Sequence, residues 1–298
     1  MLIDTLREAG FEIRLVFAPE SAFGGLPIAR VGHDFLKRTS QIIWPGTLCL
    51  GRMFLSLRLR VWARFWRRLG LEIRRLAGAD FPDPIARASV PLSQTEAQTL
   101  AAAIDAEAPD LVVAEYSALG PVLTKLQTPG VSKAILLHDL FSQRAQTMRA
   151  NDKPVDFTEL SLKEEAAMCA AADQLIYASR AEREVLSPLL PDKVHHWLAP
   201  LRQPCQVIAP SGQPRALFMG VRHRGNLDAL EFLMEEIWPQ VTAQVPDAEL
   251  CIVGEIGRYL KPEWRRQPGV RIHGIVEDLA QFGGADTIGL APTRRASP

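Results

Sequence analysis

The 298-residue sequence predicts an α/β protein with two domains, each built on a parallel β-sheet. Short apolar strands alternate with helical patterns along the chain, and several strands end at a glycine or a polar side chain. Four prolines interrupt residues 199–214, which indicates a linker between two runs of strands. Such alternation implies right-handed crossovers and parallel sheets, in which ligands bind beyond the carboxyl ends of the strands.

The first domain is expected to span residues 1–205. It opens on a helix, because Leu2, Leu6 and Ala9 recur at helical spacing and Gly10 follows the last turn. The chain thus lacks the strand and tight turn that normally open a doubly wound domain. Helices are expected at 95–107 and 157–172, and strands at 11–17, 111–115, 134–139, 174–179 and 194–199.

The second domain is expected to span residues 206–298. Its loop at residues 221–225 leads into a helix that starts near Asn226. Strands are expected at 216–220, 249–254, 271–274 and 287–292, and the first three end in glycine.

The charge of the chain is balanced overall but not along its length. Lys plus Arg and Asp plus Glu both number 34, so composition does not indicate a nucleic-acid partner. Residues 52–75 contain eight arginines and one glutamate, a net charge of +7. Apolar residues recur there at helical spacing: Phe54, Leu57, Val61, Phe65 and Leu69, flanked by Trp62 and Trp66. The segment is either a basic amphipathic helix for an anionic membrane or a domain helix with solvated arginines.

The sequence favours a cytoplasmic protein, peripheral on the inner membrane face if the basic segment binds lipid. No apolar run is long enough for a membrane-spanning helix, and residues 1–10 do not have the pattern of a signal peptide. The four cysteines are widely spaced, which suits reduced thiols. No D-x-D triplet or metal-ligand spacing occurs, so we expect no metal and no cofactor.

The second half resembles a known family over the segments FMGVRHRGNLDALEFLMEEIWPQVTAQVPDAELCIVG and PGVRIHGIVEDLAQFGGADTIGLAP. These resemble the donor-binding domain of family 4 (group 1) glycosyltransferases. The segment LLHDLFSQRAQTMRA and the residues behind it resemble the acceptor domain more loosely. The resemblance implies the GT-B fold of two Rossmann-like domains. It also implies metal-independent, retaining hexosyl transfer from a nucleotide-sugar donor to a glycan or lipid-linked acceptor.

Arg222, Arg224 and Asn226 are the candidates for binding the donor diphosphate. They lie between a strand and the start of a helix, where backbone N–H groups and guanidinium groups attract phosphate. Asn226 is also expected to cap that helix. The alternative is a solvated turn with ordinary surface arginines.

His138 and Asp139 are the candidate catalytic residues, because they follow a strand at the rim of the sheet. A histidine there suits proton transfer or sugar-hydroxyl binding, and Asp139 could orient it. Glu115, Tyr116 and Arg144 are candidates on the acceptor side. The alternative for all five is a role in packing and capping.

The chain departs from the family pattern at both ends. The family carries a glycine-rich loop with a lysine and an E-x7-E pair after a segment like TIGLAPTRR, and this chain ends at Pro298. It therefore looks truncated at both ends, with incomplete sheets and impaired activity. Two alternatives to a working transferase stay open: an inactive fragment with residual ligand binding, and a nucleotide-sugar epimerase of the same fold.

Overall fold

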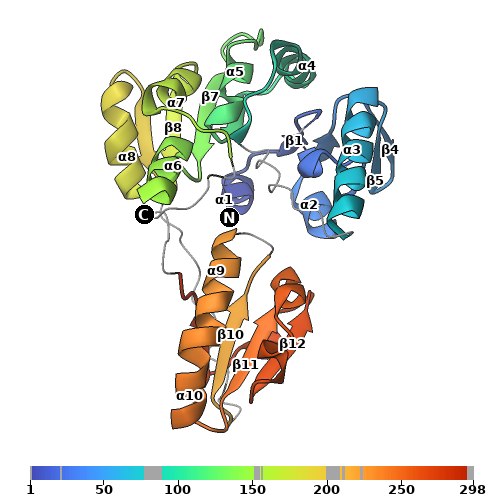
Figure 1. Cartoon of the computed structure of the whole chain (residues 1–298). Coiled ribbons are helices and arrows are strands. Elements are labelled where there is room, and N and C mark those ends of the chain that lie inside the picture. The colour runs from blue at the N-terminus through green and yellow to red at the C-terminus, as the bar shows by residue number, and fades with distance from the viewer. Residues whose placement is uncertain are drawn as a thin grey trace. The chain divides into compact units, whose positions relative to one another are not determined.

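The computed structural model describes residues 2–20, 22–76, 89–150, 155, 157–198, 209, 212–221 and 224–293. The chain divides into two compact units, Met1–Leu201 and Arg202–Ser297, and each is described by itself. Each unit contains a four-stranded parallel sheet with helices in its connections (Figure 1). The predicted α/β class with two parallel sheets is confirmed.

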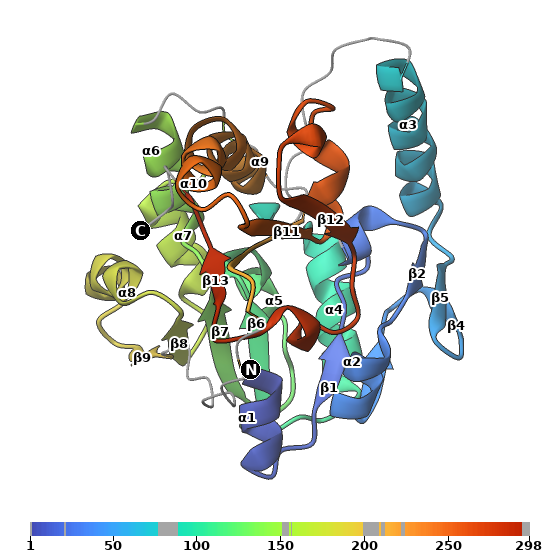
Figure 2. The same cartoon turned by 90° about the horizontal axis from the view of Figure 1, so that it is seen from below.

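The main sheet of the first unit has its strands in chain order. The strands are β6 (Leu111–Glu115), β7 (Ser132–Leu137), β8 (Gln174–Tyr177) and β9 (Val194–Trp197), and every neighbouring pair is parallel (Figure 2). All four coincide with predicted strands to within two residues at each end. The helices of this part are α4 (Gln94–Asp105), α5 (Gly120–Leu123), α6 (Phe141–Ala150), α7 (Leu162–Cys169) and α8 (Arg180–Leu186), with short turns η3 (Ser117–Leu119) and η4 (Ser187–Leu189).

Helix α7 begins five residues later than the expected start at residue 157. Ser161 is its N-cap, and the Ser161 side chain and the Glu164 side chain each accept a hydrogen bond from the other's backbone N–H. This reciprocal capping box fixes the start of the helix. The signal S-x-x-E was present in the sequence, but the apolar Phe157 led to an earlier predicted start.

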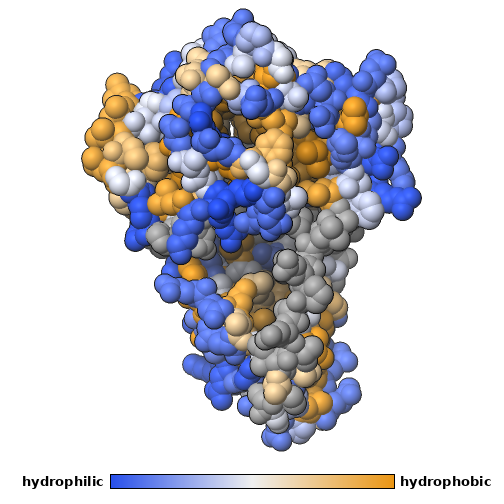
Figure 3. Space-filling model, turned by 180° about the vertical axis from the view of Figure 1, so that it is seen from behind, coloured by the Kyte–Doolittle hydropathy of each residue, from blue (hydrophilic) through white to orange (hydrophobic). Residues whose placement is uncertain are grey.

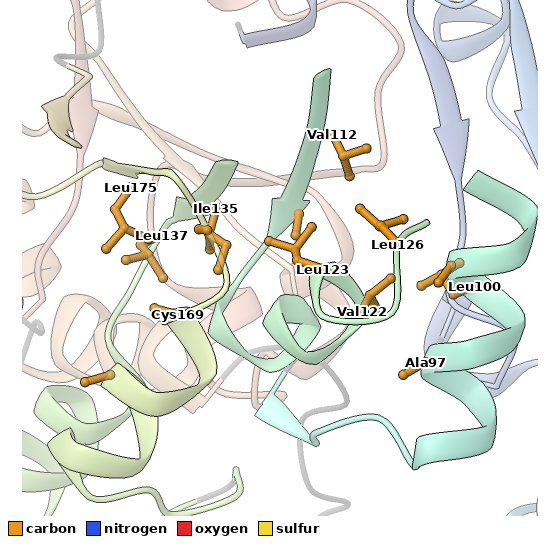
Figure 4. Close-up of a cluster of buried hydrophobic side chains, with 14 of the residues drawn as sticks. Ala97, Leu100, Val112, Val122, Leu123, Leu126, Ile135, Leu137, Cys169 and Leu175 are labelled. Atoms are coloured by element: carbon orange, nitrogen blue, oxygen red, sulfur yellow. The ribbon is translucent and has the colours of Figure 1, made fainter. Parts of the chain in front are cut away.

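The core of the first unit lies between this sheet and its helices. Ala97 and Leu100 of α4, Val122 and Leu123 of α5, and Cys169 of α7 pack on strand residues that include Ile135, Leu137 and Leu175 (Figure 4). A Cβ on Gly120 would lie 1.9 Å from the backbone oxygen of Met168, so α5 and α7 approach closely only because residue 120 is glycine. Burial raises the pKa of the Cys169 thiol to about 12, so this thiol stays protonated.

The N-terminal part contains strands that the sequence did not predict. The expected helix α1 (Leu2–Glu8) and strand β1 (Arg14–Val16) are present, and β1 pairs in parallel with β3 (Gln41–Ile43). A separate antiparallel sheet has the order β2-β5-β4, from Ile28–Arg30, Met53–Ser56 and Thr47–Leu50. The other elements are η1 (Ala22–Gly25), α2 (His33–Arg38) and α3 (Leu59–Leu76), and α3 leads away from the small sheet (Figure 2).

The second unit is a parallel sheet with the order β12-β11-β10-β13. The strands are β10 (Arg215–Met219), β11 (Glu249–Val253), β12 (Val270–Gly274) and β13 (Thr287–Leu290). One long helical segment follows β10, formed by α9 (Arg224–Phe232), a π-helical turn η5 (Leu233–Ile237) and α10 (Trp238–Gln244). Its buried face packs Leu230, Leu233 and Trp238 against Leu250 and Ile252. Short turns η6 (Glu255–Tyr259), η7 (Trp264–Arg266) and η8 (Ala280–Phe282) complete the unit.

The strand order places a topological switch point beside β10. The chain moves outward from β10 through β11 to β12 and then returns to the other side of β10 with β13. Open parallel sheets bind ligands at the carboxyl ends of the two strands where the order reverses. In this unit those ends are the β10–α9 loop and the residues that follow Leu290.

Candidate functional site

The first candidate cluster lies at the carboxyl ends of β6 and β7. Glu115 is the last residue of β6 and His138 directly follows β7. His138 Nε2 lies 4.0 Å from Glu115 Oε1, and 41% of the histidine side chain and 65% of the glutamate side chain are exposed. The parallel register, which pairs Glu115 with Leu136, brings these two side chains together.

This pair biases the protonation of both groups. The Glu115 carboxylate raises the pKa of His138 above its usual 6.5, and partial burial opposes that effect. Interaction with His138 in turn lowers the pKa of Glu115. A histidine that gains a proton near neutral pH can donate to an anionic oxygen, and after losing it can accept from a hydroxyl group.

Tyr116 packs its ring against His138 and has an unusual backbone conformation. Its φ of 65° is positive although it is not glycine, and its N–H donates to Leu136 O at 2.9 Å. The Tyr116 ring lies between His138, at 5.0 Å between centroids, and Phe141, at 5.6 Å. Burial, followed by the nearby Asp139 and Glu115 carboxylates, raises the pKa of Tyr116. Backbone strain of this kind is found at functional sites, where the surroundings hold it in place.

Asp139 and Arg144 form an ion pair at the start of α6. Arg144 Nη1 lies 3.4 Å from Asp139 Oδ2, and its guanidinium carbon is 5.1 Å from the centre of the Phe157 ring. The structure therefore orients Asp139 toward Arg144 rather than toward His138. Glu115 is the carboxylate that contacts His138, whereas Asp139 acts on the histidine through its charge.

Glu165 of α7 makes hydrogen bonds to both the loop after β6 and the start of α6. Its side chain is fully buried and accepts four hydrogen bonds. Oε1 accepts from Ser117 Oγ at 2.8 Å and from Phe141 N at 3.0 Å, and Oε2 accepts from Ser142 N at 3.0 Å and Ser142 Oγ at 2.7 Å. A carboxylate from α7 thus satisfies the first amides of α6 and fixes the loop after Tyr116.

The second candidate cluster lies at the carboxyl ends of β10, β11 and β12. Gly254 follows β11 with φ 97°, and a Cβ there would lie 2.3 Å from Gly220 O. Gly220 N donates to Val253 O at 3.0 Å, and Ile256 N donates to Gly220 O at 3.1 Å. These bonds hold the start of the β10–α9 loop against the loop after β11, at the edge where a parallel sheet binds ligands.

Asn226 lies in the first turn of α9 and does not cap it. The helix begins at Arg224, and the Asn226 side-chain amide donates to Val221 O at 3.1 Å. The expected N-cap is therefore wrong, because the helix starts two residues earlier than predicted. The bond to Val221 instead closes the loop back onto the helix. Arg222 lies outside the described residues.

The basic segment divides into a buried part and an exposed part. Phe54 is 3% exposed in β5 and Val61 is 1% exposed in α3, so these two residues belong to the core, as the domain-helix interpretation expects. Further along α3, Leu59, Trp66 and Ile73 recur at seven-residue spacing and are 84%, 60% and 58% exposed. Among the described helices, none is both long and apolar enough to cross a membrane.

Comparison with known proteins supports the resemblance in the second unit. Residues 213–297 match the family described as glycosyl transferases group 1. No curated protein matches the chain. The predicted resemblance to group 1 glycosyltransferases is confirmed for that part of the chain.

Two solved structures share weak structural likeness with somewhat more than 60% of this chain. One is a UDP-forming α,α-trehalose-phosphate synthase from Burkholderia xenovorans, with a TM-score of 0.39 and 10% identity over 63% of this chain and 55% of that chain. The other is TarM, with a TM-score of 0.39 and 10% identity over 61% of this chain and 36% of that chain. The chain therefore spans about half and about one third of their lengths.

The structure brings together five of the predicted residues and adds two that the sequence analysis missed. Glu115, Tyr116, His138 and Asp139 lie at one rim of the first unit, with Arg144 beside Asp139. The missed residues are Glu165 and Glu182, both buried and both bonded to backbone amides of this rim. One signal was available, since Glu165 lies three residues after Leu162 and four before Cys169, on the apolar face of its helix.

Proposed function

We propose that this chain transfers a sugar from a nucleotide-sugar donor to the hydroxyl group of a glycan or lipid-linked acceptor. The observation that carries the proposal is the match of residues 213–297 to group 1 glycosyltransferases. The switch point beside β10 supports it, because this is where a parallel sheet holds a nucleotide. The second unit would bind the donor and the first unit the acceptor.

The donor diphosphate would lie at the β10–α9 loop. Gly254 lets backbone approach backbone closely there, and Gly220 leaves room for the Asn226 side chain, which closes the loop onto the first turn of α9. The N–H groups of that turn and the arginines at 222 and 224 would neutralise the phosphates. This assignment needs no metal ion, in keeping with the absence of a D-x-D triplet from the sequence.

In the proposed reaction the bond between the anomeric carbon and the diphosphate oxygen breaks. A bond forms between that carbon and the acceptor oxygen, and the acceptor hydroxyl passes its proton to the oxygen of the nucleoside diphosphate that leaves. We assign to His138 the binding or protonation of an oxygen at this stage, and the charged form that Glu115 favours supports this role. Retention of configuration and the transfer of a hexose follow from the resemblance and form part of the proposal.

The donor site is tested by binding of UDP and GDP, measured by calorimetry. Arg224→Ala is expected to weaken binding by about tenfold, since one charge-assisted contact to phosphate contributes roughly 1.5 kcal/mol. Asn226→Ala should weaken it by a few fold through the lost bond to Val221. Arg266→Ala, an exposed arginine of η7, is the matched control. Equal affinity in all four proteins would contradict the site.

Catalysis is tested by hydrolysis and transfer assays with common nucleotide sugars. We expect His138→Ala to lower turnover by about a hundredfold, the usual contribution of a proton-transfer group, without changing nucleoside diphosphate affinity. Loss of affinity together with turnover would place His138 in donor binding instead. Turnover at the wild-type level would remove it from the site.

We further propose that the first unit contacts the cytoplasmic face of an anionic membrane. Along α3 the arginines at 60, 67 and 74 follow directly after the exposed apolar residues at 59, 66 and 73, so a basic stripe borders an apolar one. The small sheet adds apolar surface, because Ile28, Leu48, Leu50 and Met53 are all more than 40% exposed (left side of Figure 3). Such surfaces bind anionic lipid through buried apolar area and charge.

The membrane proposal is tested by sedimentation with vesicles that contain anionic or only neutral lipids. Arg60→Glu combined with Arg67→Glu should lower binding to anionic vesicles by at least about 30-fold, at roughly 1 kcal/mol per basic residue. Arg64 is left unchanged because it pairs with the buried Glu20. The control reverses the exposed Arg258 and Arg266 of the second unit. Equal binding to neutral and anionic vesicles would contradict the proposal.

A further inference from the structure

Glu182 is a buried carboxyl group directly behind the segment that carries His138 and Asp139. It lies in the first turn of α8 and is 3% exposed. Its Oε1 accepts a hydrogen bond from Leu140 N at 2.8 Å. Among the described residues, Oε2 has no hydrogen-bond partner. A buried carboxyl oxygen without a partner carries a cost, so its presence calls for a physical reason.

Comparison within the chain shows that Glu182 does not serve as an ordinary helix cap. Three helices begin with the pattern S-x-x-E. In α4 and α7 the glutamates, the half-buried Glu96 and the exposed Glu164, accept from the backbone N–H of their capping serines. In α8 the serine accepts from Glu182 N, but the Glu182 side chain turns inward to Leu140. Glu182 therefore does not complete a capping box, and its side chain instead binds the loop after β7.

We propose that Glu182 is a positioning residue of the site: its carboxyl group fixes the segment 138–140 through the Leu140 amide, and the loss of its proton shifts that segment. The proposal deepens the assignment of His138 and in that respect rests on the proposed function. Glu165 accepts hydrogen bonds from the next two amides, of Phe141 and Ser142. Two buried glutamates from different helices therefore bind the backbone of three successive residues, 140–142.

The charge state of Glu182 is sensitive because of what surrounds it. Burial is the main cause that raises the pKa of Glu182 to about 7; the Leu140 N–H lowers this pKa, and the Asp139 and Glu165 carboxylates contribute to raising it. Asp139 belongs to the loop after β7 and Glu165 to α7, so carboxyl groups from two other elements act on Glu182 through their charge. Deprotonation of Glu182 adds a negative charge near the Asp139 and Glu165 carboxyl groups, and Asp139 directly follows His138 in the chain.

The sign of the effect on stability follows from this shift. The raised pKa means that the folded protein binds the Glu182 proton more tightly than the unfolded chain between pH 4.5 and about 7. The free energy of unfolding therefore falls as pH rises through this window. Glu182→Gln removes the ionisation and can keep the bond from Leu140 N, so this variant should be less sensitive to pH over the same range.

The test is an NMR titration of the ligand-free protein, labelled with 15N and with 13C at glutamate carboxyl groups. In the wild type we expect the Glu182 carboxyl carbon and the Leu140 amide to share a transition with a midpoint of about 7. Glu182→Gln should abolish that transition at Leu140, while the His138 ring keeps its own ionisation. Glu184→Gln, an exposed glutamate two residues along α8, should leave it intact.

Two results would overturn the proposal. One is a Leu140 amide that titrates identically in the wild type and in Glu182→Gln. The other, which needs only the wild type, is a Glu182 carbon and a Leu140 amide with different midpoints. Neither readout involves a sugar donor, so an inactive protein that shows the shared transition contradicts the proposed function and leaves the role of Glu182 standing.

Discussion

Replacing Glu165 with glutamine should loosen the rim that carries His138 and Tyr116. The wild-type carboxylate uses one oxygen for Phe141 N and the other for Ser142 N, both at 3.0 Å. Glutamine has one acceptor oxygen, so its NH2 group must face one of these amide donors. The hydroxyl groups bonded to Glu165 can rotate to accept from an NH2 group, but a backbone N–H cannot.

The expected loss follows from one buried amide. Removing a hydrogen bond to a charged acceptor and leaving its N–H donor buried costs about 3 kcal/mol. A loss of that size corresponds to roughly a hundredfold in an equilibrium constant. We therefore expect the local opening of residues 138–150 to become about a hundred times more frequent.

The assay is hydrogen exchange measured by mass spectrometry. Peptides from residues 138–150 should exchange about a hundredfold faster in Glu165→Gln, and peptides from residues 249–260 in the other unit provide an unchanged reference. Glu164→Gln is the matched control, because it changes the adjacent glutamate of the same helix and glutamine can still complete the capping box with Ser161. Exchange within threefold of the wild type would refute the inferred role of Glu165.

Two further predictions concern the rim and the loop of the second unit. Glu115→Gln should lower the NMR-measured pKa of His138 toward 6.5, and an unchanged pKa would remove Glu115 as the cause of the raised value. In the wild type the pair should stabilise the fold between the pKa of Glu115 and that of His138. This contribution should be lost below and above that pH window. Gly254→Ala should destabilise the second unit by about 2 kcal/mol or more, from its positive φ and the contact with Gly220 O. Gly274→Ala, with positive φ and no close neighbour, is the control in thermal unfolding, and equal losses would exclude the contact as a cause.

The strands of both parallel sheets could be predicted because their signal is local. A buried parallel strand is a short apolar run, and LVVAE, QLIY and ELCIV are such runs with polar or glycine residues after them. The carboxyl ends of two further strands, β7 and β10, then identified His138 and the loop after β10 as candidates. A capping box is equally local, and Ser161 with Glu164 sets the start of α7 more accurately than apolar content did.

The small antiparallel sheet was missed because its strands have no period of their own. Residues 53–56 resembled the start of the basic helix, since Phe54 stands in the helical series with Val61. In the structure β5, which carries the buried Phe54, pairs with its hairpin neighbour β4 and with β2, a more distant segment of the chain. The pairing with β2 depends on which segments meet, and no local pattern reports it.

The sequence by itself determined the strands, the glycine-terminated loops and the resemblance in residues 213–297, because each depends on neighbouring residues. Only the tertiary structure decided what the polar groups at the rim contact. Ser179 and Glu182 have the spacing of Ser93 and Glu96, yet only the second pair forms a capping box, because the loop after β7 offers Glu182 the amide of Leu140. A buried carboxyl group takes the donor that folding brings to it, and that donor lies 42 residues away.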